Sequence, residues 1–219
     1  WEPAGSPRLT ADTRVWYNPE LKSSYFMVPG VLGMILMTLT VNTAALAIVR
    51  ERETGTLEQL LVTPLRPREL VVGKLAPLIV LSYVEMLVVL AFVRVWFGVP
   101  LTGSIPVLLT MSFMFLLANL GLGLVISALA KSQQEAQMVS FLLLTPSMLL
   151  SGFMFPIQNM PPLVQTLTLS IPFRWYLEIV RGVFLRGVGL TTLWTPCVVL
   201  TGMSGGLLLL GMLVLRKRL

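Results

Sequence analysis

Charged side chains are the residues of this chain that could do chemistry, and they are few and clustered. The 219 residues include 16 Lys and Arg, 10 Asp and Glu, and no His. Five of the 16 basic residues and four of the 10 acidic residues lie in one polar stretch, residues 50–74. The missing His removes the usual general base and the commonest transition-metal ligand, and the single Cys197 excludes an internal disulfide or a Cys-rich metal site. We therefore expect no catalytic residue and no metal site.

The polar stretch 50–74 has the pattern of a short helix between two turns. Thr56 and Gln59 have the spacing of a capping box, in which each side chain satisfies a free amide at a helix start. Thr63 precedes Pro64, which disfavours continuation of the helix. Three apolar residues fall on one helical face: Leu57, Leu60 and Leu61. A short helix with a leucine face and acidic neighbours at a membrane surface indicates a docking element.

Glu85 is the second site of interest, because it lies near the middle of the apolar run 75–93. A charge at that depth costs at least about 2.5–3.5 kcal/mol on insertion scales. Arg94 follows nine residues later and falls on the opposite helical face, so it does not relieve this cost easily. Glu85 is then either a carboxylate facing a translocation path or a protonated or hydrogen-bonded acid packed near Asn119 or Asn42.

The composition places these residues in an integral membrane protein. The chain is 55% hydrophobic and 12% charged, with a mean hydropathy of +0.83, whereas soluble domains have about 25% charged residues. The net charge of +6 could suggest nucleic acid. However, the basic residues lie at the ends of apolar runs, where positive charge orients a membrane protein. We expect an all-α, multi-pass membrane protein in contact with lipid and no nucleic-acid partner.

Five apolar runs are long enough to cross about 30 Å of hydrocarbon, which takes about 20 residues. The predicted spans are 25–49, 75–93, 105–130, 136–155 and 190–215. Small residues at close-packing spacings predict tight helix contacts within one subunit: Gly121, Gly123, Ser127, Gly202, Gly205 and Gly206. Positive charge is denser on the side that holds residues 50–74, which predicts that this stretch and the C-terminus are cytoplasmic.

Two segments outside the spans complete the predicted organisation. Residues 1–24 are polar, begin with Trp1 and lack a signal-peptide pattern, so we expect the end of an extracytoplasmic segment of a longer protein. Residues 156–189 are too polar and too rich in Pro to cross a membrane, but they contain helical stretches at Pro161–Leu169 and Phe173–Phe184. Amphipathic helices with aromatics predict interfacial or re-entrant elements; a structured loop is the alternative.

Several of these motifs resemble the permease subunits of type-2 ATP-binding cassette (ABC) exporters. The segment Glu51–Pro64, ERETGTLEQLLVTP, resembles a signature of that family. The segments SGFMFP at 151–156, MPP at 160–162 and RGVFLRG at 181–187 resemble its outer region. The similarity extends over almost the whole chain from about Tyr17.

The resemblance implies a six-span permease in a bacterial inner membrane, of which this chain lacks the first span and most of a soluble region that follows it. It also implies that residues 54–63 form a coupling helix seated in a separate ATPase subunit. Two ATPases, which bind ATP and Mg, and two permeases, as a homo- or heterodimer, make the working unit. The residues assigned to docking are Glu51, Glu53, Gly55, Thr56, Leu57, Glu58, Leu60, Leu61, Thr63 and Pro64; those assigned to the outer region are Pro156, Pro161 and Arg181.

The chain itself has no ATP-binding loop. Gly73-Lys74 is followed by Leu75, and position 68 is Arg where a P-loop requires Gly. We therefore expect no enzyme in this chain, but a permease that moves a hydrophobic drug-like or lipid-like substrate outward. One rival is a secondary transporter driven by an ion gradient at Glu85. The other is a membrane scaffold that docks a soluble partner. For Glu58 the alternative to ATPase contact is a favourable position at the positive end of the helix dipole.

Overall fold

The computed structural model describes residues 23–55, 67–97, 103–187 and 190–218. Within these ranges all regular secondary structure is helical. The long helices are α1 (Ser23–Glu53), α3 (Pro67–Phe97), α4 (Ile105–Leu129), α5 (Gln133–Leu150) and α8 (Leu190–Arg218). The short elements are η1 (Ile157–Asn159), α6 (Pro162–Thr168), α7 (Pro172–Arg181) and the π-helical turn η2 (Gly182–Arg186).

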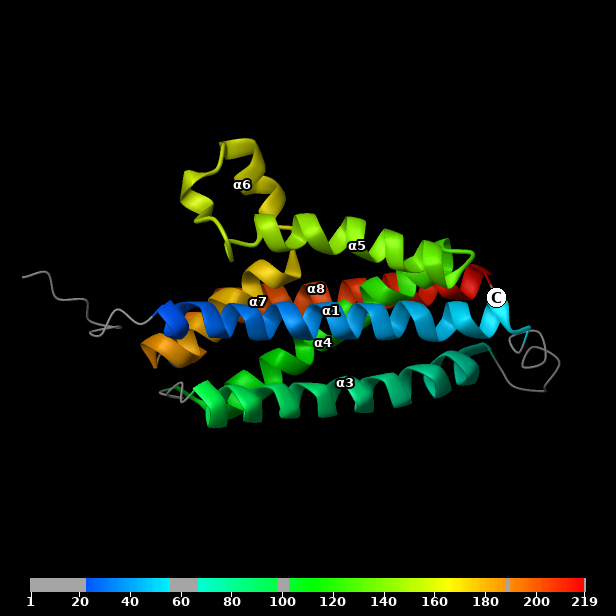
Figure 1. Cartoon of the computed structure of the whole chain (residues 1–219), viewed down its shortest axis with the longest axis horizontal. Helices are drawn as coiled ribbons and strands as arrows, with labels where there is room; N and C mark the ends of the chain where they lie inside the picture. Colours follow the sequence, from blue (N-terminus) through cyan, green and yellow to red (C-terminus); the bar gives the residue numbers. More distant parts are fainter. Residues whose placement is uncertain (1–22, 56–66, 98–102, 188–189, 219) are drawn as a thin grey trace, which may run out of the picture.

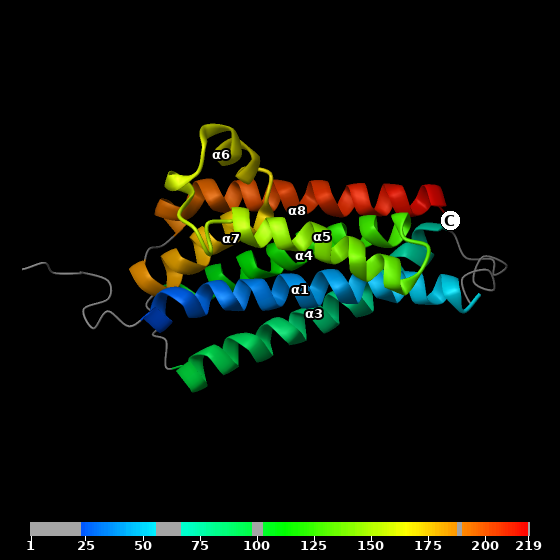
Figure 2. The ribbon, with the colours of Figure 1, turned by 45° about the horizontal axis from the view of Figure 1, so that its top comes forward.

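The long helices lie side by side in an elongated bundle (Figures 1 and 2). The helices α1, α4 and α8 run in one direction, whereas α3 and α5 run in the other. The central helix is α4, which is buried along most of its length and makes its largest contacts with α8 and α1. It carries no charged residue, which suits a helix with little exposure to either water or lipid. The expectation of an all-α, multi-pass membrane protein is confirmed.

The number of spans differs slightly from the five expected. Four of the described helices are long and apolar enough to cross a membrane: α1, α3, α4 and α8. The exception is α5, which has 18 residues and begins with the polar run Gln133-Gln134-Glu135. It ends at Leu150, five residues before the end predicted for the span at 155. Figure 1 shows α5 stopping before the bundle end at which α1 begins, and α7 covering the remaining length.

The segment after α5 contains both helical stretches expected from the sequence. The first, α6, stands out from the bundle (Figure 2) and exposes Leu163 and Leu167. The second, α7, lies within the bundle and packs against α8, α1 and α4. On α7, Phe173 and Tyr176 are fully buried, and the Tyr176 ring stacks on Phe115 of α4 at a centroid distance of 4.1 Å. The structure thus has a buried helix here and not a plain loop; the interfacial or re-entrant placement in the membrane stays a prediction.

Glycines set the close approach of α4 to its neighbours. A Cβ atom at Gly121 would lie 2.5 Å from the backbone of Leu207 on α8, and one at Gly211 would lie 2.6 Å from the carbonyl oxygen of Gly121. On another face of α4, a Cβ at Gly123 would lie 2.5 Å from the Ala44 Cβ of α1. The prediction of tight contacts is therefore met at Gly121 and Gly123. It is wrong for three glycines of α8, which have no neighbouring atom within 4 Å: Gly202, Gly205 and Gly206.

We predict that Gly121→Ala lowers the free energy of unfolding by about 1–3 kcal/mol, the usual cost of overpacking. The added methyl group meets the Leu207 backbone, which cannot rotate away as a side chain would. The measurement is the unfolding transition of the purified protein in detergent. The matched control is Gly205→Ala, where the methyl group has open space. Equal stability of the two variants would show that the α4–α8 contact does not require Gly121.

Candidate functional site

The end of α1 leads into the segment predicted to dock the ATPase. Thr54 donates from its hydroxyl to the Arg50 carbonyl at 3.0 Å, and Gly55 donates its N–H to the Arg52 carbonyl at 3.2 Å. Gly55 has a φ of 71°, a left-handed conformation that favours glycine and commonly ends a helix. The other residues assigned to docking, Thr56 to Pro64, lie outside the described residues, so the coupling helix stays a prediction.

Three consecutive side chains at the end of α1 bind other parts of the chain, and we call these contacts the α1-end clamp. Glu51 forms an ion pair with Lys74 of α3. Arg52 donates from Nη1 to the Ala130 carbonyl, directly after α4, at 3.0 Å. Glu53 accepts from the Gln133 backbone N–H at 2.9 Å and also from the Gln133 side-chain amide. The clamp therefore joins the end of α1 to the beginning of α3 and to the turn between α4 and α5.

The turn between α4 and α5, which the clamp contacts, is also held by local hydrogen bonds. Ser132 caps α5 by accepting the Glu135 backbone N–H at 3.2 Å, and Glu135 accepts the Lys131 backbone N–H at 2.8 Å. This reciprocal pattern satisfies free amides at the helix start, as in a capping box. Arg52 similarly satisfies a carbonyl left free where α4 ends. The clamp thus connects parts that are already held locally.

The clamp changes the interpretation of two predicted residues. The sequence analysis assigned Glu51 and Glu53 to ATPase docking, whereas in the structure both bind residues of this chain. It did not foresee Lys74 or Gln133 as their partners. For Lys74 a signal was present: Glu51 follows one apolar run and Lys74 precedes the next, so opposite charges meet where two antiparallel helices begin and end. Gln133 gave no comparable signal, because amides are ordinary at a helix start.

A second set of side chains lies in the interior of the bundle. Asn119 of α4 is fully buried, and within the described residues neither its amide nitrogen nor its amide oxygen has a hydrogen-bond partner. The same holds for one carboxylate oxygen of Glu85 and for three hydroxyl groups: those of Thr40, Ser82 and Ser140. Buried polar groups are nearly always paired, and leaving one unpaired costs about 1–3 kcal/mol.

Four of these residues belong to α1, α3 and α4, and we call them the polar set: Thr40, Ser82, Glu85 and Asn119. Ala44 of α1, Leu78 of α3 and Leu120 of α4 form one apolar cluster. Thr40 lies one turn before Ala44 and Ser82 one turn after Leu78, on the same helical faces. Because α1 and α3 are antiparallel, both steps lead in the same direction along the bundle.

Asn119 and Glu85 lie at different levels of the bundle, because Asn119 is next to Leu120 of that cluster, whereas Glu85 lies seven residues beyond Leu78. Asn119 lies one turn before Gly123, whose face contacts Val41 and Ala44 of α1. Glu85 lies three residues after Ser82 and shares its face of α3. Asn42, in contrast, is two residues from Thr40 and thus about 200° around the helix. The translocation path predicted at Glu85, Asn119 and Asn42 therefore stays a prediction.

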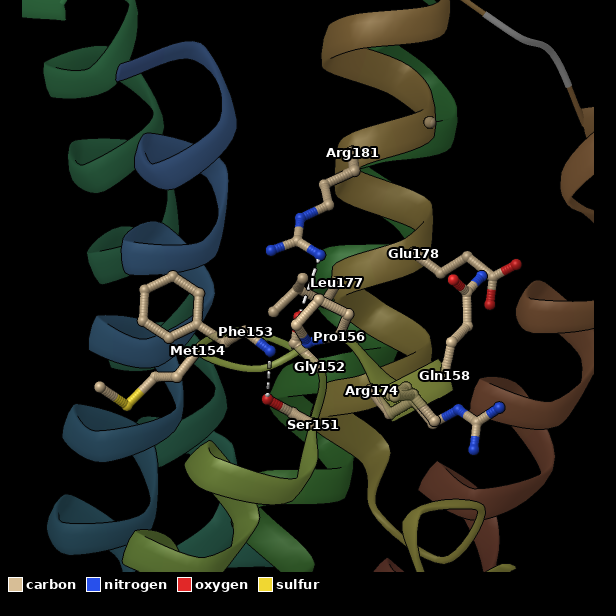
Figure 3. Close-up of a pocket in the computed structure, with 12 residues that line it drawn as sticks. Ser151, Gly152, Phe153, Met154, Pro156, Gln158, Arg174, Leu177, Glu178 and Arg181 are labelled. Atoms are coloured by element: carbon tan, nitrogen blue, oxygen red, sulfur yellow. Dashed lines mark hydrogen bonds between the residues drawn. The ribbon is translucent and has the colours of Figure 1, made fainter. Parts of the chain in front are cut away.

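The third feature is a cavity of about 420 Å³ between the segment that follows α5 and the helix α7 (Figure 3). Arg181 points toward Gly152 and donates from Nη1 to its carbonyl at 3.2 Å. Burial lowers the pKa of Arg181 to about 10, so the guanidinium remains charged at neutral pH. Of the residues predicted for the outer region, Arg181 and Pro156 line this cavity and Pro161 does not.

The fold and these sites define a class of protein: a multi-pass helical membrane protein without a metal-binding cluster among the residues described. The comparison with known families gives a specific assignment. The model of the ABC-2 type transporter family matches residues 12–185. The chain belongs to this family, as its motifs predicted.

Individual relatives agree with this assignment. The chain is 35% identical over 196 residues to the probable multidrug ABC transporter permease YbhR of Escherichia coli strain K12, covering 88% of this chain and 53% of the relative. It is 36% identical over 182 residues to the probable multidrug ABC transporter permease YbhS, covering 83% of this chain and 48% of the relative. It is 30% identical over 213 residues to the inner membrane transport permease YhhJ, covering 96% of this chain and 57% of the relative. YbhS and YhhJ are from the same strain as YbhR. The chain thus spans about half the length of these curated relatives.

We predict that Glu51→Lys lowers the free energy of unfolding by up to about 1 kcal/mol, a value typical of partly exposed ion pairs. The new lysine repels Lys74, whose side chain is only 13% exposed. Adding Lys74→Glu exchanges the two charges and should restore most of the loss. Unfolding of the wild type, both single variants and the double variant gives the coupling free energy of the pair. If the losses in free energy of unfolding of the two single variants simply add in the double variant, the contact between residues 51 and 74 is contradicted. The control is Lys131→Glu, which changes an exposed charge at the same end of the bundle.

Proposed function

We propose that this chain is the part of an ABC exporter permease that converts movement of a separate ATPase into movement of its helices. The α1-end clamp is the observation that carries the proposal. Residues 54–63, the predicted coupling helix, lie between α1 and α3 in the sequence. The clamp ties the end of α1 to Lys74 of α3 and to Gln133 of α5. A force applied to the connection would therefore reach α1, α3 and the α4–α5 turn together.

The proposed complex contains two ATPase subunits, which bind ATP and Mg, and two permeases. We place it in a bacterial inner membrane, with the clamp and the C-terminus on the cytoplasmic side, in line with the density of positive charge. The substrate is proposed to be a hydrophobic drug-like or lipid-like molecule that moves outward. The names of YbhR and YbhS as probable multidrug permeases support this substrate class.

The experiment that tests coupling combines Glu58→Arg with Leu60→Asp in the predicted coupling helix. The permease is co-expressed with a candidate ABC ATPase and purified in lipid nanodiscs. We expect the wild type to retain the ATPase, and the double variant to insert normally but to lose at least about tenfold in ATPase affinity, because a buried leucine and a charge contact are removed together. Lys131→Glu is the matched control for a charge change on the same side.

Three results would contradict the coupling proposal. Equal ATPase binding by wild type and double variant would show that residues 54–63 do not dock it. Transport in nanodiscs without any ATPase, driven by an ion gradient and abolished by Glu85→Gln, would instead establish a secondary transporter. ATPase binding without any ATP-dependent transport would support a scaffold.

The polar set is our candidate for part of the translocation path. Its members come from α1, α3 and α4, so relative movement of these helices would change the surroundings of Asn119 and Glu85. A buried amide without a partner reduces stability, and such a cost is commonly retained at functional sites. The ion-gradient alternative would use the same residues, with Glu85 as the group that binds the ion.

We predict opposite outcomes for two buried polar residues of α4. Asn119→Leu removes an unpaired amide, so the free energy of unfolding should stay unchanged or rise, while transport turnover falls. Ser112→Ala removes the hydroxyl that lies 2.8 Å from the Tyr176 hydroxyl. Its free energy of unfolding should fall by about 1–3 kcal/mol, because the buried tyrosine then lacks a partner.

Thermal unfolding in detergent and transport in proteoliposomes, measured on the same preparations, test this pair. Both residues are fully buried on the same helix, so each variant is the control for the other. A loss of stability in Asn119→Leu with unchanged transport would show that Asn119 is a packing residue outside the path.

A further inference from the structure

We infer that Glu85 of α3 binds a lipophilic organic cation that reaches it from within the bilayer. This binding step deepens the proposed export function, because it gives the substrate a charge, and it rests on that function only for the outward direction of transport. The depth of Glu85, its position at the surface of the bundle and its lack of a counter-charge each limit the chemistry of the occupant.

Glu85 carries a carboxylate to the middle of the membrane. The apolar part of α3 extends from Gly73 to Trp96, so Glu85 lies 12 residues from one end and 11 from the other. Ionisable residues at such a depth are costly, and they mark substrate or ion pathways or pair with one another. The other candidate spans, α1, α4 and α8, contain no acidic residue at a comparable depth. Glu85 is therefore the one acid deep within the four described spans.

Glu85 lies on a helix that is open to lipid. In Figures 1 and 2, α3 runs along the outside of the bundle, and only 22% of its apolar segment is buried. The side chain of Glu85 is half-buried, and Val84 and Val88 beside it are 50% and 61% exposed. An amphiphile dissolved in the bilayer can therefore reach the carboxylate without crossing the packed interior of the bundle.

Two polar groups at this position lack partners within the described part of the chain. One carboxylate oxygen of Glu85 is buried without a hydrogen bond, and so is the hydroxyl of Ser82, which is 1% exposed. Ser82 lies three residues earlier on the same face of α3, which places both groups within one helical turn. On the same helix, Arg94 lies on the opposite face, and Lys74 forms an ion pair with Glu51. A cation from outside the chain would stabilise the carboxylate, because charges attract strongly in a medium of low dielectric constant.

The surroundings of Glu85 favour an organic cation over a metal ion. Calcium and magnesium take about six or more oxygen ligands, whereas the neighbouring positions on α3 are apolar: Leu81, Val84, Met86 and Val88. Among the described residues, no three acidic, His or Cys side chains come together as a metal-binding group. An organic cation needs no such ligands, since its apolar body packs on these side chains while its charge lies beside the carboxylate. The proposed ligand is a monovalent cation with a large apolar surface.

Binding is tested with the purified permease in phosphatidylcholine nanodiscs, without any ATPase, by equilibrium dialysis of radiolabelled tetraphenylphosphonium. Empty nanodiscs give the amount that partitions into lipid. We expect saturable binding by the wild type, and none of tetraphenylborate, an anion of nearly the same shape that is measured separately. Glu85→Gln keeps the size of the side chain and should weaken cation binding about tenfold or more, as expected when a charge contact is lost. Glu85→Asp keeps the charge and should weaken it less.

Two controls separate this role from others. Glu178→Gln, the same change at an exposed acid of α7, should leave cation binding unchanged. Glu85→Gln removes a charge from hydrocarbon, so thermal unfolding should show a variant at least as stable as the wild type. The variant with Glu58→Arg and Leu60→Asp should bind the cation like the wild type, because no ATPase is present. A failure of cation binding is thus distinguishable from a failure of ATP coupling.

Four results would overturn the cation site. Equal binding by the wild type and Glu85→Gln would show that the carboxylate is not the contact. Tetraphenylborate bound as tightly as tetraphenylphosphonium would remove the preference for positive charge. Permease nanodiscs that bind no more cation than empty nanodiscs would make Glu85 a protonated packing residue. Displacement of tetraphenylphosphonium by an equal concentration of sodium would assign Glu85 to an inorganic ion instead.

Discussion

The close approach of α4 to α8 and α1 is the contact on which the rest of the structure depends. In hydrocarbon, an apolar side chain gains little by leaving lipid for another helix, so association depends on tight van der Waals packing. Gly121 and Gly211 bring the backbones of α4 and α8 together, and Gly123 brings α4 against α1. Since α3 and α7 both pack on α1 and α4, their positions follow from this central contact.

Polar interactions then act at two different depths. At the end of α1, the clamp holds three parts of the chain together through side chains close to water, where pairing costs little. Inside the bundle, Ser112 and Tyr176 satisfy each other and hold α7 to α4. Asn119, seven residues later on α4, has no such partner among the residues described. The contrast between these two buried positions separates a polar group that contributes to packing from one whose retention needs a functional reason.

The break between α5 and α7 creates the remaining feature of the fold. Because α5 ends at Leu150, the chain leaves the bundle, forms α6 and returns as the buried helix α7. This path of the chain places Arg181 of α7 opposite the backbone of Gly152. It also encloses a cavity between α7 and the segment after α5, which would be absent if α5 continued as one uninterrupted span. A charged residue is tolerated there because it faces this cavity and a carbonyl oxygen instead of lipid.

The sequence by itself determined the class of protein, the position of the long helices and the family. Apolar runs of about 20 residues without charges have few alternatives to membrane helices, and the motif at 51–64 indicated the ABC-2 family that the match over residues 12–185 confirms. The two helical stretches after α5 were also predictable, because Pro and aromatic residues mark them. The coupling helix falls outside the described residues and remains a prediction.

Only the tertiary structure decided which residues meet. It paired Glu51 with Lys74 and Glu53 with Gln133, left the buried amide of Asn119 without a partner among the described residues, and buried α7 among α1, α4 and α8. Helical periodicity specifies which side chains share a face, but not which neighbouring helix covers that face. Glycine shows the same limit: Gly121 and Gly205 both occur in apolar helices, yet only Gly121 lies against a neighbouring backbone. Such contacts depend on the relative rotation and depth of two helices, which packing of the whole bundle sets.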